Sequence, residues 1–478
     1  MRSSFAAVSI SVMLLIGCTD SDANLPRPST TGSNLLGATE LVGRVPEGLL
    51  ILQGSDGATL GIDAEGGVQD YGRGTRYVLS KDRLRAAFVQ PAGSGKFMGI
   101  GVLTAERQAM IHESQWDGNR GGMFPSFAWS QDGSKIAFAV PDAGHGNKSL
   151  VFAANEDGSD ERQLPLSADD YEIKGWTTDG RVLALAVGGL PSNPQPRLLL
   201  AGDAVFDIPI PHDLTLMDAQ MSPDGRRVAF ESGDFHKRLE VWFLDVSDGV
   251  PRKIAEAGAT SEALAKVYVS SIPLSVVPGF RRVNASLKGE PPIAWAPDSA
   301  RIAYFQGDMT AGEWELRVIN TVTGEDVSVA ADVSWAAEWS PDGRYLATTK
   351  ERRTGPGEIL LFGPDGSTKE LSAGAGNLAW SQSGSLIANG DGVRVIWPDS
   401  GEADEVTVPD RGDLGMGFPA SNVWSPSGRF LAVTGWSNGE NGTVSVYILD
   451  AQTATVTLIA NNSSFRPVAW MRTTDGGR

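Results

Sequence analysis

Glu338–Thr348 reads EWSPDGRYLAT, and this stretch decides the fold because close relatives of it recur along the whole chain. Its centre, Ser340-Pro341-Asp342-Gly343, suits a type I turn, since proline presets φ at the second position while serine and glycine fit the first and fourth. An apolar stretch ending at Trp339 precedes the turn, and the β-prone run Tyr345–Thr348 follows it. The stretch therefore predicts a β-hairpin.

The relatives of this stretch are regularly spaced. Their shared feature is an apolar residue, usually tryptophan, followed by a turn and a second β-prone run: YVLSKDRLRAAF from Tyr77, FAWSQDGSKIAF from Phe127, GWTTDGRVLAL from Gly175, AQMSPDGRRVAF from Ala219, AWAPDSARIAYF from Ala294, AWSQSGSLIAN from Ala379, VWSPSGRFLAV from Val423 and a truncated VAWM at Val468–Met471. The tryptophan position returns every 41 to 50 residues, apart from one interval of 74. This is the period of a propeller blade. The sequence thus predicts an all-β fold, a single β-propeller of four-stranded blades.

The repeat count gives eight or nine blades. Eight units begin with the motif, and a further unit from Gly48 has three strand-like runs without a Trp-bearing strand before them. We predict that Phe465–Met471, near the far end of the chain, supplies this missing inner strand and closes the ring, because closure removes exposed sheet edges. The complete count is then nine, and eight stays open because the units at Tyr77 and Gly175 are less regular.

The N-terminal residues resemble a lipoprotein signal. Basic Arg2 precedes the apolar run Phe5–Ile16 of 12 residues, which is short for a membrane span and typical of an export signal. The run closes with Leu15-Ile16-Gly17-Cys18, which resembles the lipobox of bacterial lipoproteins. This resemblance implies removal of 1–17 and lipidation of Cys18; an ordinary secretory peptide is the alternative. Cys18 is the only cysteine, so no intramolecular disulfide can form.

Residues 18–44 are predicted to be the lipidated cysteine and a flexible tether, since they are rich in Ser, Thr, Pro, Asn and Asp and lack periodicity. The propeller is expected over 45–478. Thr19, rather than aspartate, follows Cys18, which by family resemblance favours the outer membrane over the inner one. The net charge of −18, without a basic run, makes nucleic acid an unsuitable partner.

The strand order predicts which loops share a face. If the four strands of a blade are a to d, the a–b and c–d turns lie on one face, here called the motif face. The b–c and d–a connections lie on the opposite, variable face. The c–d turns are short, as at 155–160, 245–249 and 363–367, while the b–c connections are longer and dissimilar, as at 140–149, 187–197, 350–358 and 435–442. Loops on a rigid scaffold often carry binding, so we predict function on the variable face.

One long insertion, Gly258–Glu290, accounts for the 74-residue interval and falls in a d–a connection. SEALAK at 261–266 suggests a short helix, and the apolar stretches VYVSSI and LSVV need something to pack on. Long loops are frequently functional. A lid or docking platform and an extra edge strand both remain open.

Catalytic patterns are weak. Gly435–Gly439, GWSNG, matches the G-x-S-x-G pattern of serine hydrolases, but it falls between two predicted strands and not at the strand-to-helix turn of a nucleophile elbow. The four histidines, at 112, 145, 212 and 236, lack metal-ligand spacing and are interpreted as loop residues. His145 and His236 map to b–c connections with Asp142 and Asp234, so a metal site there is the alternative.

The motif residues themselves favour an architectural role. The turn aspartates are expected to bond nearby backbone N–H groups, and no EF-hand spacing is present; they are Asp132, Asp179, Asp224, Asp298 and Asp342. Seven of the 13 tryptophans occupy the motif position, which predicts packing between blades.

The ligand candidates are residues that we expect in variable loops. Trp314 and Trp436 are the aromatic ones, and Arg352 and Arg353 add positive charge to the same face, a solvated hairpin tip being the alternative for the arginines. His145 and His236 complete this set. No catalytic, metal-binding or cofactor constellation is recognised, so the sequence predicts no enzyme and no cofactor.

The W-S-P-D-G-x-x-[ILV]-A pattern resembles the TolB-like, or WD40-like "PD40", β-propeller repeat from about residue 45 to 471. The repeat occurs in TolB, which binds envelope partners, and in propeller domains of prolyl oligopeptidase and dipeptidyl peptidase IV relatives. A tether is predicted where TolB has an α/β domain, and with eight residues after Trp470 we expect no hydrolase domain like that of the peptidases. The resemblance implies a lipid-anchored envelope module that binds a protein, peptide or glycan. The alternatives are a polysaccharide lyase or hydrolase acting in the central funnel and a purely structural envelope component.

Overall fold

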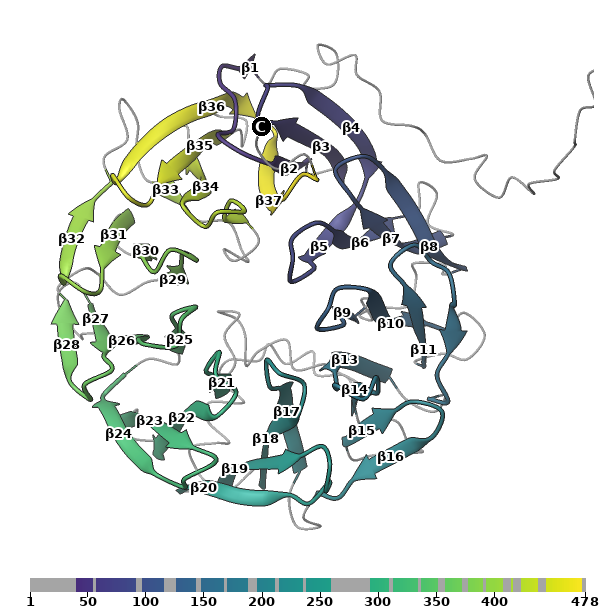
Figure 1. The fold of residues 1–478 in the computed structure, drawn as a ribbon, viewed down its shortest axis with the longest axis vertical. Helices are drawn as coiled ribbons and strands as arrows, with labels where there is room; N and C mark the ends of the chain where they lie inside the picture. The colour runs from purple at the N-terminus through teal and green to yellow at the C-terminus, as the bar shows by residue number, and fades with distance from the viewer. Residues whose placement is uncertain are drawn as a thin grey trace, which may run out of the picture.

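Nine blades form a closed ring in the computed structural model, with the first strand of each blade innermost (Figure 1). The structure describes residues 40–54, 57–91, 97–115, 126–142, 148–166, 170–187, 196–210, 215–234, 238–258, 293–308, 313–333, 337–350, 357–371, 377–389, 393–406, 414–415, 423–436 and 444–474. Within these ranges the chain forms 37 β-strands and no α-helix, and all pairings are antiparallel. The all-β propeller prediction is confirmed, and the blade number is nine.

The first four blades are built as follows. Blade 1 contains β37 (Phe465–Met471), β2 (Leu49–Gly54), β3 (Ala58–Asp63) and β4 (Val68–Arg73); blade 2 contains β5 (Thr75–Leu79), β6 (Ala86–Pro91), β7 (Phe97–Leu103) and β8 (Gln108–Gln115); blade 3 contains β9 (Ser126–Trp129), β10 (Lys135–Pro141), β11 (Ser149–Asn155) and β12 (Arg162–Gln163); blade 4 contains β13 (Asp170–Trp176), β14 (Val182–Val187), β15 (Arg197–Ala201) and β16 (Val205–Ile208).

The remaining five blades repeat this order. Blade 5 contains β17 (Thr215–Met221), β18 (Arg227–Asp234), β19 (Arg238–Asp245) and β20 (Arg252–Gly258); blade 6 contains β21 (Ile293–Trp295), β22 (Arg301–Asp308), β23 (Glu313–Asn320) and β24 (Asp326–Ala331); blade 7 contains β25 (Ala337–Trp339), β26 (Leu346–Lys350), β27 (Glu358–Phe362) and β28 (Thr368–Leu371); blade 8 contains β29 (Asn377–Trp380), β30 (Leu386–Asn389), β31 (Val393–Trp397) and β32 (Glu402–Glu405); blade 9 contains β33 (Leu414–Gly415), β34 (Phe430–Trp436), β35 (Val444–Asp450) and β36 (Thr455–Ser463), to which β1 (Glu40–Leu41) adds a fifth strand.

The two ends of the chain close the ring. Strand β37 pairs with β2, so that Leu50 lies opposite Trp470, and this confirms the predicted closure by Phe465–Met471. A buried arginine joins this seam to its neighbours. Arg83 is 7% exposed and donates from Nε to the Trp470 carbonyl at 3.2 Å and from Nη2 to the carbonyls of Trp470 and Trp424. Blades 1, 2 and 9 are therefore held together at one point.

The core is a series of apolar layers between neighbouring blades, and the motif tryptophans lie in it. Four of them donate their indole N–H to the inner strand of the preceding blade, while Trp470 donates to the Glu47 carbonyl at 2.7 Å; the four are Trp129 to Val78, Trp176 to Ala128, Trp339 to Ala294 and Trp380 to Glu338. Among the described residues, the indole nitrogens of Trp295 and Trp424 have no such partner. The predicted packing between blades is thus observed.

The long insertion lies between β20 and β21, as expected for a d–a connection. Its residues from 259 onward, including the predicted helix 261–266, lie outside the described ranges. In the part of the chain that the structure describes, no helix is long and apolar enough to cross a membrane.

Candidate functional site

The turns of the motif face direct their polar side chains back onto themselves. In the turn of blade 3, Asp132 Oδ1 accepts the hydroxyls of Ser130 and Ser134 at 2.6 and 2.8 Å. Hydrogen bonds from Ser130 and Ser134 lower the pKa of Asp132 to about 2. In blade 4, bonding to Arg181, aided by the Thr177 hydroxyl, lowers the pKa of Asp179 to about 2. These carboxylates therefore act as turn residues, as the sequence predicts.

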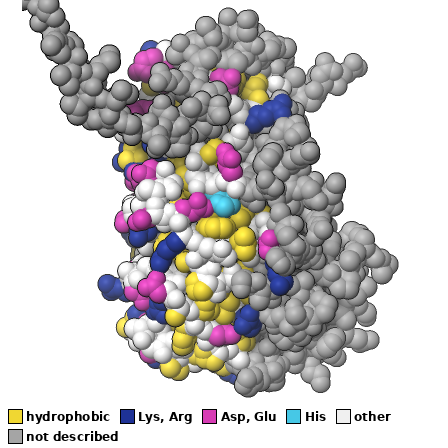
Figure 2. Space-filling view, turned by 90° about the vertical axis from the view of Figure 1, so that its right-hand side faces the viewer, with side chains coloured by type: hydrophobic (Ala, Val, Ile, Leu, Met, Phe, Trp, Pro, Cys, Tyr) yellow, Lys and Arg dark blue, Asp and Glu magenta, His cyan; other side chains and the backbone are white. Residues whose placement is uncertain are grey.

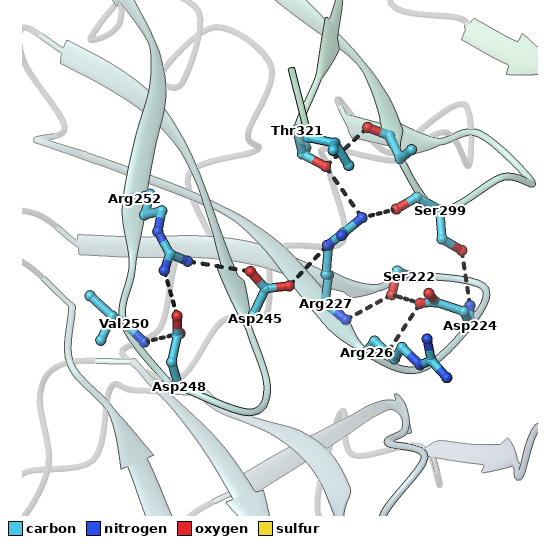
Figure 3. A network of polar contacts seen from close by, with 12 residues as sticks. Ser222, Asp224, Arg226, Arg227, Asp245, Asp248, Val250, Arg252, Ser299 and Thr321 are labelled. Carbon is cyan, nitrogen blue, oxygen red and sulfur yellow. Dashed lines mark hydrogen bonds and ion pairs between the residues drawn. The ribbon is translucent and has the colours of Figure 1, made fainter. Parts of the chain in front are cut away.

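Larger motif-face networks join adjacent blades (Figure 3). Arg227, at the start of β18, donates to Asp245 Oδ1 at 2.9 Å and to the Ser299 carbonyl of blade 6 at 2.8 Å. Asp245 also accepts a hydrogen bond from Arg252, and Arg252 forms an ion pair with Asp248. The Ser299 hydroxyl accepts the amide of Asp224 at 3.0 Å. The polar groups of this junction are used to fix blade 5 against blade 6.

The outer wall adds a mixed surface between the two faces. Figure 2 shows acidic, basic and hydrophobic side chains interspersed along it, with yellow side chains gathered mainly in its lower half. Val205 and Phe206 of β16 are 41% and 43% exposed, and Val250 in the next blade is 53% exposed. These residues make a small apolar patch at the junction of blades 4 and 5.

The variable face differs from the motif face in what its strand ends bury. Strands b and c of blades 5, 7 and 9 carry polar or charged side chains there that are 6% exposed or less: Glu231, Ser232, Glu240, Thr348, Thr349, Glu358, Thr434 and Ser445. Burying such groups is unfavourable without partners, so they are usually bonded. Glu240 accepts Trp242 Nε1 at 3.1 Å and pairs with Lys253 at 3.4 Å. Ser232 Oγ has no hydrogen-bond partner among the described residues.

One charged cluster lies on the inner strands of blades 4 and 5. Lys174 Nζ on β13 is 2.7 Å from Asp218 Oδ1 on β17 and 3.0 Å from Glu172 Oε2. Burial acts to lower the pKa of Lys174, but the two carboxylates outweigh it and raise the pKa above its ordinary value. Lys174 therefore stays protonated between the two carboxyl groups. Directly across the β17–β18 pairing, Asp218 faces Glu231.

The sequence-predicted ligand residues fall largely outside these clusters. His145, His236, Arg352 and Arg353 lie outside the described residues. Trp314 and Trp436 differ from expectation, because their backbones belong to β23 and β34 and not to loops. Both still lie at strand ends next to b–c connections, since Trp314 pairs with Gly307 and Trp436 with Val444.

The histidine interpretation needs one correction. His112 lies in β8 and not in a loop, with its Nδ1 2.5 Å from Glu161 Oε1. Its ring is 5.2 Å from the ring of Phe138 and 4.6 Å from that of Phe152. A half-buried histidine against two aromatic rings is a packing residue of the junction between blades 2 and 3. Among the described residues, no group of three metal-binding side chains comes together.

Sequence reasoning missed the cluster of Glu172, Lys174 and Asp218. The signal was present, because Glu172 and Lys174 alternate with apolar Tyr171 and Ile173 just before motif Trp176. Alternation places two such residues on one side of a strand. The partner Asp218 lies in a different blade, 44 residues along the chain, and this proximity depends on the ring geometry.

No family model and no curated protein matches the chain. Solved structures do. The chain is similar to the eukaryotic initiation factor at 10% identity and a TM-score of 0.53, over 90% of this chain and 99% of that one. It is also similar to dipeptidyl peptidase 4 of Porphyromonas gingivalis at 11% identity and a TM-score of 0.51, over 81% of this chain and 59% of that one.

TolB from Acinetobacter baumannii is another structural match, at 14% identity and a TM-score of 0.30, over 81% of this chain and 82% of that one. At such low sequence identity, a structural match carries no function over to this chain. The chain spans only 59% of the length of the peptidase. The strand topology shows that the chain is a nine-bladed β-propeller.

Proposed function

We propose that the protein is a lipid-anchored binding module of the bacterial cell envelope, which takes a protein, peptide or glycan partner on its variable face. The observation that supports the choice of face is the contrast in polar groups. On the motif face the turn side chains bond one another. Beneath the variable face, blades 5, 7 and 9 bury polar and charged side chains, and among the described residues the buried Ser232 hydroxyl has no hydrogen-bond partner. The lipobox resemblance at Leu15–Cys18 supports the anchor.

The anchor is tested by Cys18→Ala. The exported variant is expected in the soluble fraction, because two or more acyl chains give stable anchoring and their loss removes it. A Cys18→Ala protein that still sediments with membranes would contradict the proposal. Fractionation of the intact protein checks outer-membrane against inner-membrane placement, the former being favoured by Thr19.

The binding face is tested by pull-down from crosslinked envelopes. Deletion of 258–290, in the d–a connection, is expected to weaken recovery of the partner, while Thr323→Ala in the exposed motif-face turn of blade 6 is expected to leave it unchanged. Unchanged recovery after both alterations would instead favour the structural-component alternative. Equal melting temperatures are needed to show that each variant folds.

An enzyme acting on polysaccharide in the central funnel is the second candidate. The observation that favours it is the paired carboxylates of Glu172 and Asp218 on inner strands, bridged by Lys174. Two carboxylates are the usual equipment of glycoside hydrolysis. If the protein cleaves an envelope polysaccharide and Asp218→Asn abolishes this cleavage, the result supports this candidate. If the variant releases product as fast as the unaltered protein, these residues have no catalytic role.

A further inference from the structure

The outer strand of blade 4 differs from the other outer strands in its exposed side chains. Strand β16 is the last strand of its sheet, and Figure 1 shows it on the outside of the ring. Its residues Val205 and Phe206 are the exposed large hydrophobic side chains that the described outer strands contain. Exposed apolar residues at a sheet edge favour pairing with another strand, and proteins usually avoid them there. The edge of β16 is therefore a candidate for strand addition.

Several other outer edges are charged or covered. Three outer strands expose two or more charged side chains: Arg252 and Lys253 of β20, Lys369 and Glu370 of β28, and Glu402, Asp404 and Glu405 of β32. Such charges discourage edge-to-edge pairing. On blade 9, β1 pairs antiparallel with β36 and becomes a fifth strand. The outer edge of a blade in this protein therefore accepts an added antiparallel strand.

One side of β16 is apolar. Phe206 lies opposite Leu200 of β15, which belongs to the apolar layer between blades 4 and 5. Directly opposite residues of antiparallel strands share a face of the sheet, so Phe206 points toward blade 5. There it lies beside Gly249, since a Cβ on Gly249 would be 3.0 Å from Cζ of the Phe206 ring. With the exposed Val250 next along the chain, this side of the edge offers a continuous apolar surface.

The other side of β16 carries exposed carboxylates. Asp207 lies opposite Leu199, which belongs to the apolar layer between blades 3 and 4. Its side chain is 53% exposed and pairs with Arg197, which is 38% exposed, at 3.3 Å. Asp203, in the turn before β16, is 92% exposed and pairs with Arg162, which is 54% exposed, at 2.7 Å. Each carboxylate is more exposed than its arginine, so this side of the edge attracts a further cation from solvent.

We propose that the outer edge of β16 binds an extended segment of a partner protein as a fifth strand of blade 4, and that this segment alternates apolar and basic residues. The edge that no described strand covers offers backbone N–H and C=O groups, which match an extended polypeptide. An apolar residue fits opposite Phe206, and lysine or arginine fits opposite Asp207. The net charge of −18 favours encounter with a basic segment.

The experiment titrates dye-labelled synthetic peptides with the full-length protein and measures fluorescence anisotropy. The test peptide is Lys-Val-Lys-Val-Lys, blocked at both ends. One control peptide, Lys-Lys-Lys-Val-Val, has the same composition and charge but does not alternate. The other control keeps the test sequence and carries N-methylated backbone amides, which cannot donate to a strand edge. We expect the test peptide to bind about fivefold or more tightly than either control, because backbone hydrogen bonds and alternate side chains both contribute to strand addition.

Protein variants locate the binding at β16. Phe206→Lys is expected to weaken binding of the test peptide by about tenfold, because it removes apolar contact area and repels the lysines. Val322→Lys makes the same change of charge at an exposed motif-face turn of blade 6, and the affinity should stay unchanged. Asp207→Asn should weaken binding by about threefold, as expected for an exposed ion pair. Because Phe206 also lies against Gly249, Val205→Lys is a second edge variant, and melting temperatures show that each protein is folded.

Three results would overturn this inference. Equal affinity for the alternating and the reordered peptide would show charge attraction without strand addition. Equal losses in Phe206→Lys and Val322→Lys would place the binding elsewhere. A dimer of the unaltered protein that Phe206→Lys dissociates in sedimentation experiments would mean that a second copy occupies the edge. The site lies on the outer wall and does not depend on the lipid anchor or the variable face, so the Cys18→Ala protein should bind the test peptide equally well.

Discussion

The motif face and the variable face are built from the same strands but use their polar residues differently. At the motif face, Asp132 and Arg227 bond groups within their own turns or in the adjacent blade. At the variable face, buried polar residues such as Glu240 and Glu358 lie just below the surface. The comparison teaches that the most repetitive part of the sequence is architectural. The less regular strand ends at the variable face are where blades 5, 7 and 9 bury polar and charged side chains.

We expect the largest loss of stability from Trp470→Ala, which tests the architectural role of the repeat. Trp470 is fully buried in the closing strand and donates to the Glu47 carbonyl. Truncating a buried tryptophan typically costs about 3–5 kcal/mol of unfolding free energy. Chemical denaturation measures this loss, and Val322→Ala, at a position 65% exposed, is the control, with an expected change within about 0.5 kcal/mol. Similar stabilities for both variants would mean that closure does not depend on this contact.

Substitution of Arg83 tests whether its motif turn stabilises the closing junction of blades 1, 2 and 9. Burial lowers the pKa of Arg83 to about 10, and its guanidinium group donates hydrogen bonds to two backbone carbonyls. Arg83→Ala is expected to cost about 2–4 kcal/mol because it leaves those carbonyls without their donor. Arg83→Gly should cost about 1 kcal/mol less, because the residue has a φ of 62°. Lys81→Ala, exposed in the same turn, is the control for denaturant melts.

Two adjacent arginines sharpen the comparison within a single turn. Arg227→Ala should cost about 1–2 kcal/mol, since it loses bonds to Asp245 and to Ser299 of the next blade while being partly exposed. The side chain of Arg226 is exposed, and its neighbouring bond comes from the backbone amide to Asp224. Arg226→Ala should therefore leave the free energy of unfolding nearly unchanged. A loss of stability as large as that of Arg227→Ala would break the inter-blade interpretation of Figure 3.

The smallest expected effect is a pH dependence of the motif turns. The folded-state pKa of Asp179 is lowered from 3.8 to about 2, so its contribution is present above the unfolded value and is lost as pH falls toward 2. Asp179→Asn removes this titration. The melting temperatures of the two proteins should differ at pH 5 and converge by pH 2. A constant difference across this window would show that the carboxylate charge does not contribute.

Much of the fold could be predicted from sequence because its information is local. Each turn and its flanking β-prone runs specify a hairpin, and the recurrence of Trp129, Trp339 and Trp380 sets the blade period. Even the closing strand Phe465–Met471 follows from the missing inner strand of the first unit. The candidate site could be predicted less well from the sequence. The sequence predicts Trp314 and Trp436 in loops, but the structure places them at strand ends. The prediction was wrong because the residue at which a strand ends depends on its hydrogen-bonded partner strand.

The sequence by itself determined the repeat, the all-β class, the division into two faces and the lipobox resemblance at Cys18, since these depend on residues close together in the chain. Only the tertiary structure decided that there are nine blades, that Lys174 meets Asp218 from the next blade, and that Arg83 joins the closing seam. It alone placed β1 on blade 9. The physical reason is that ring closure sets which distant strands become neighbours, and no local pattern encodes that choice.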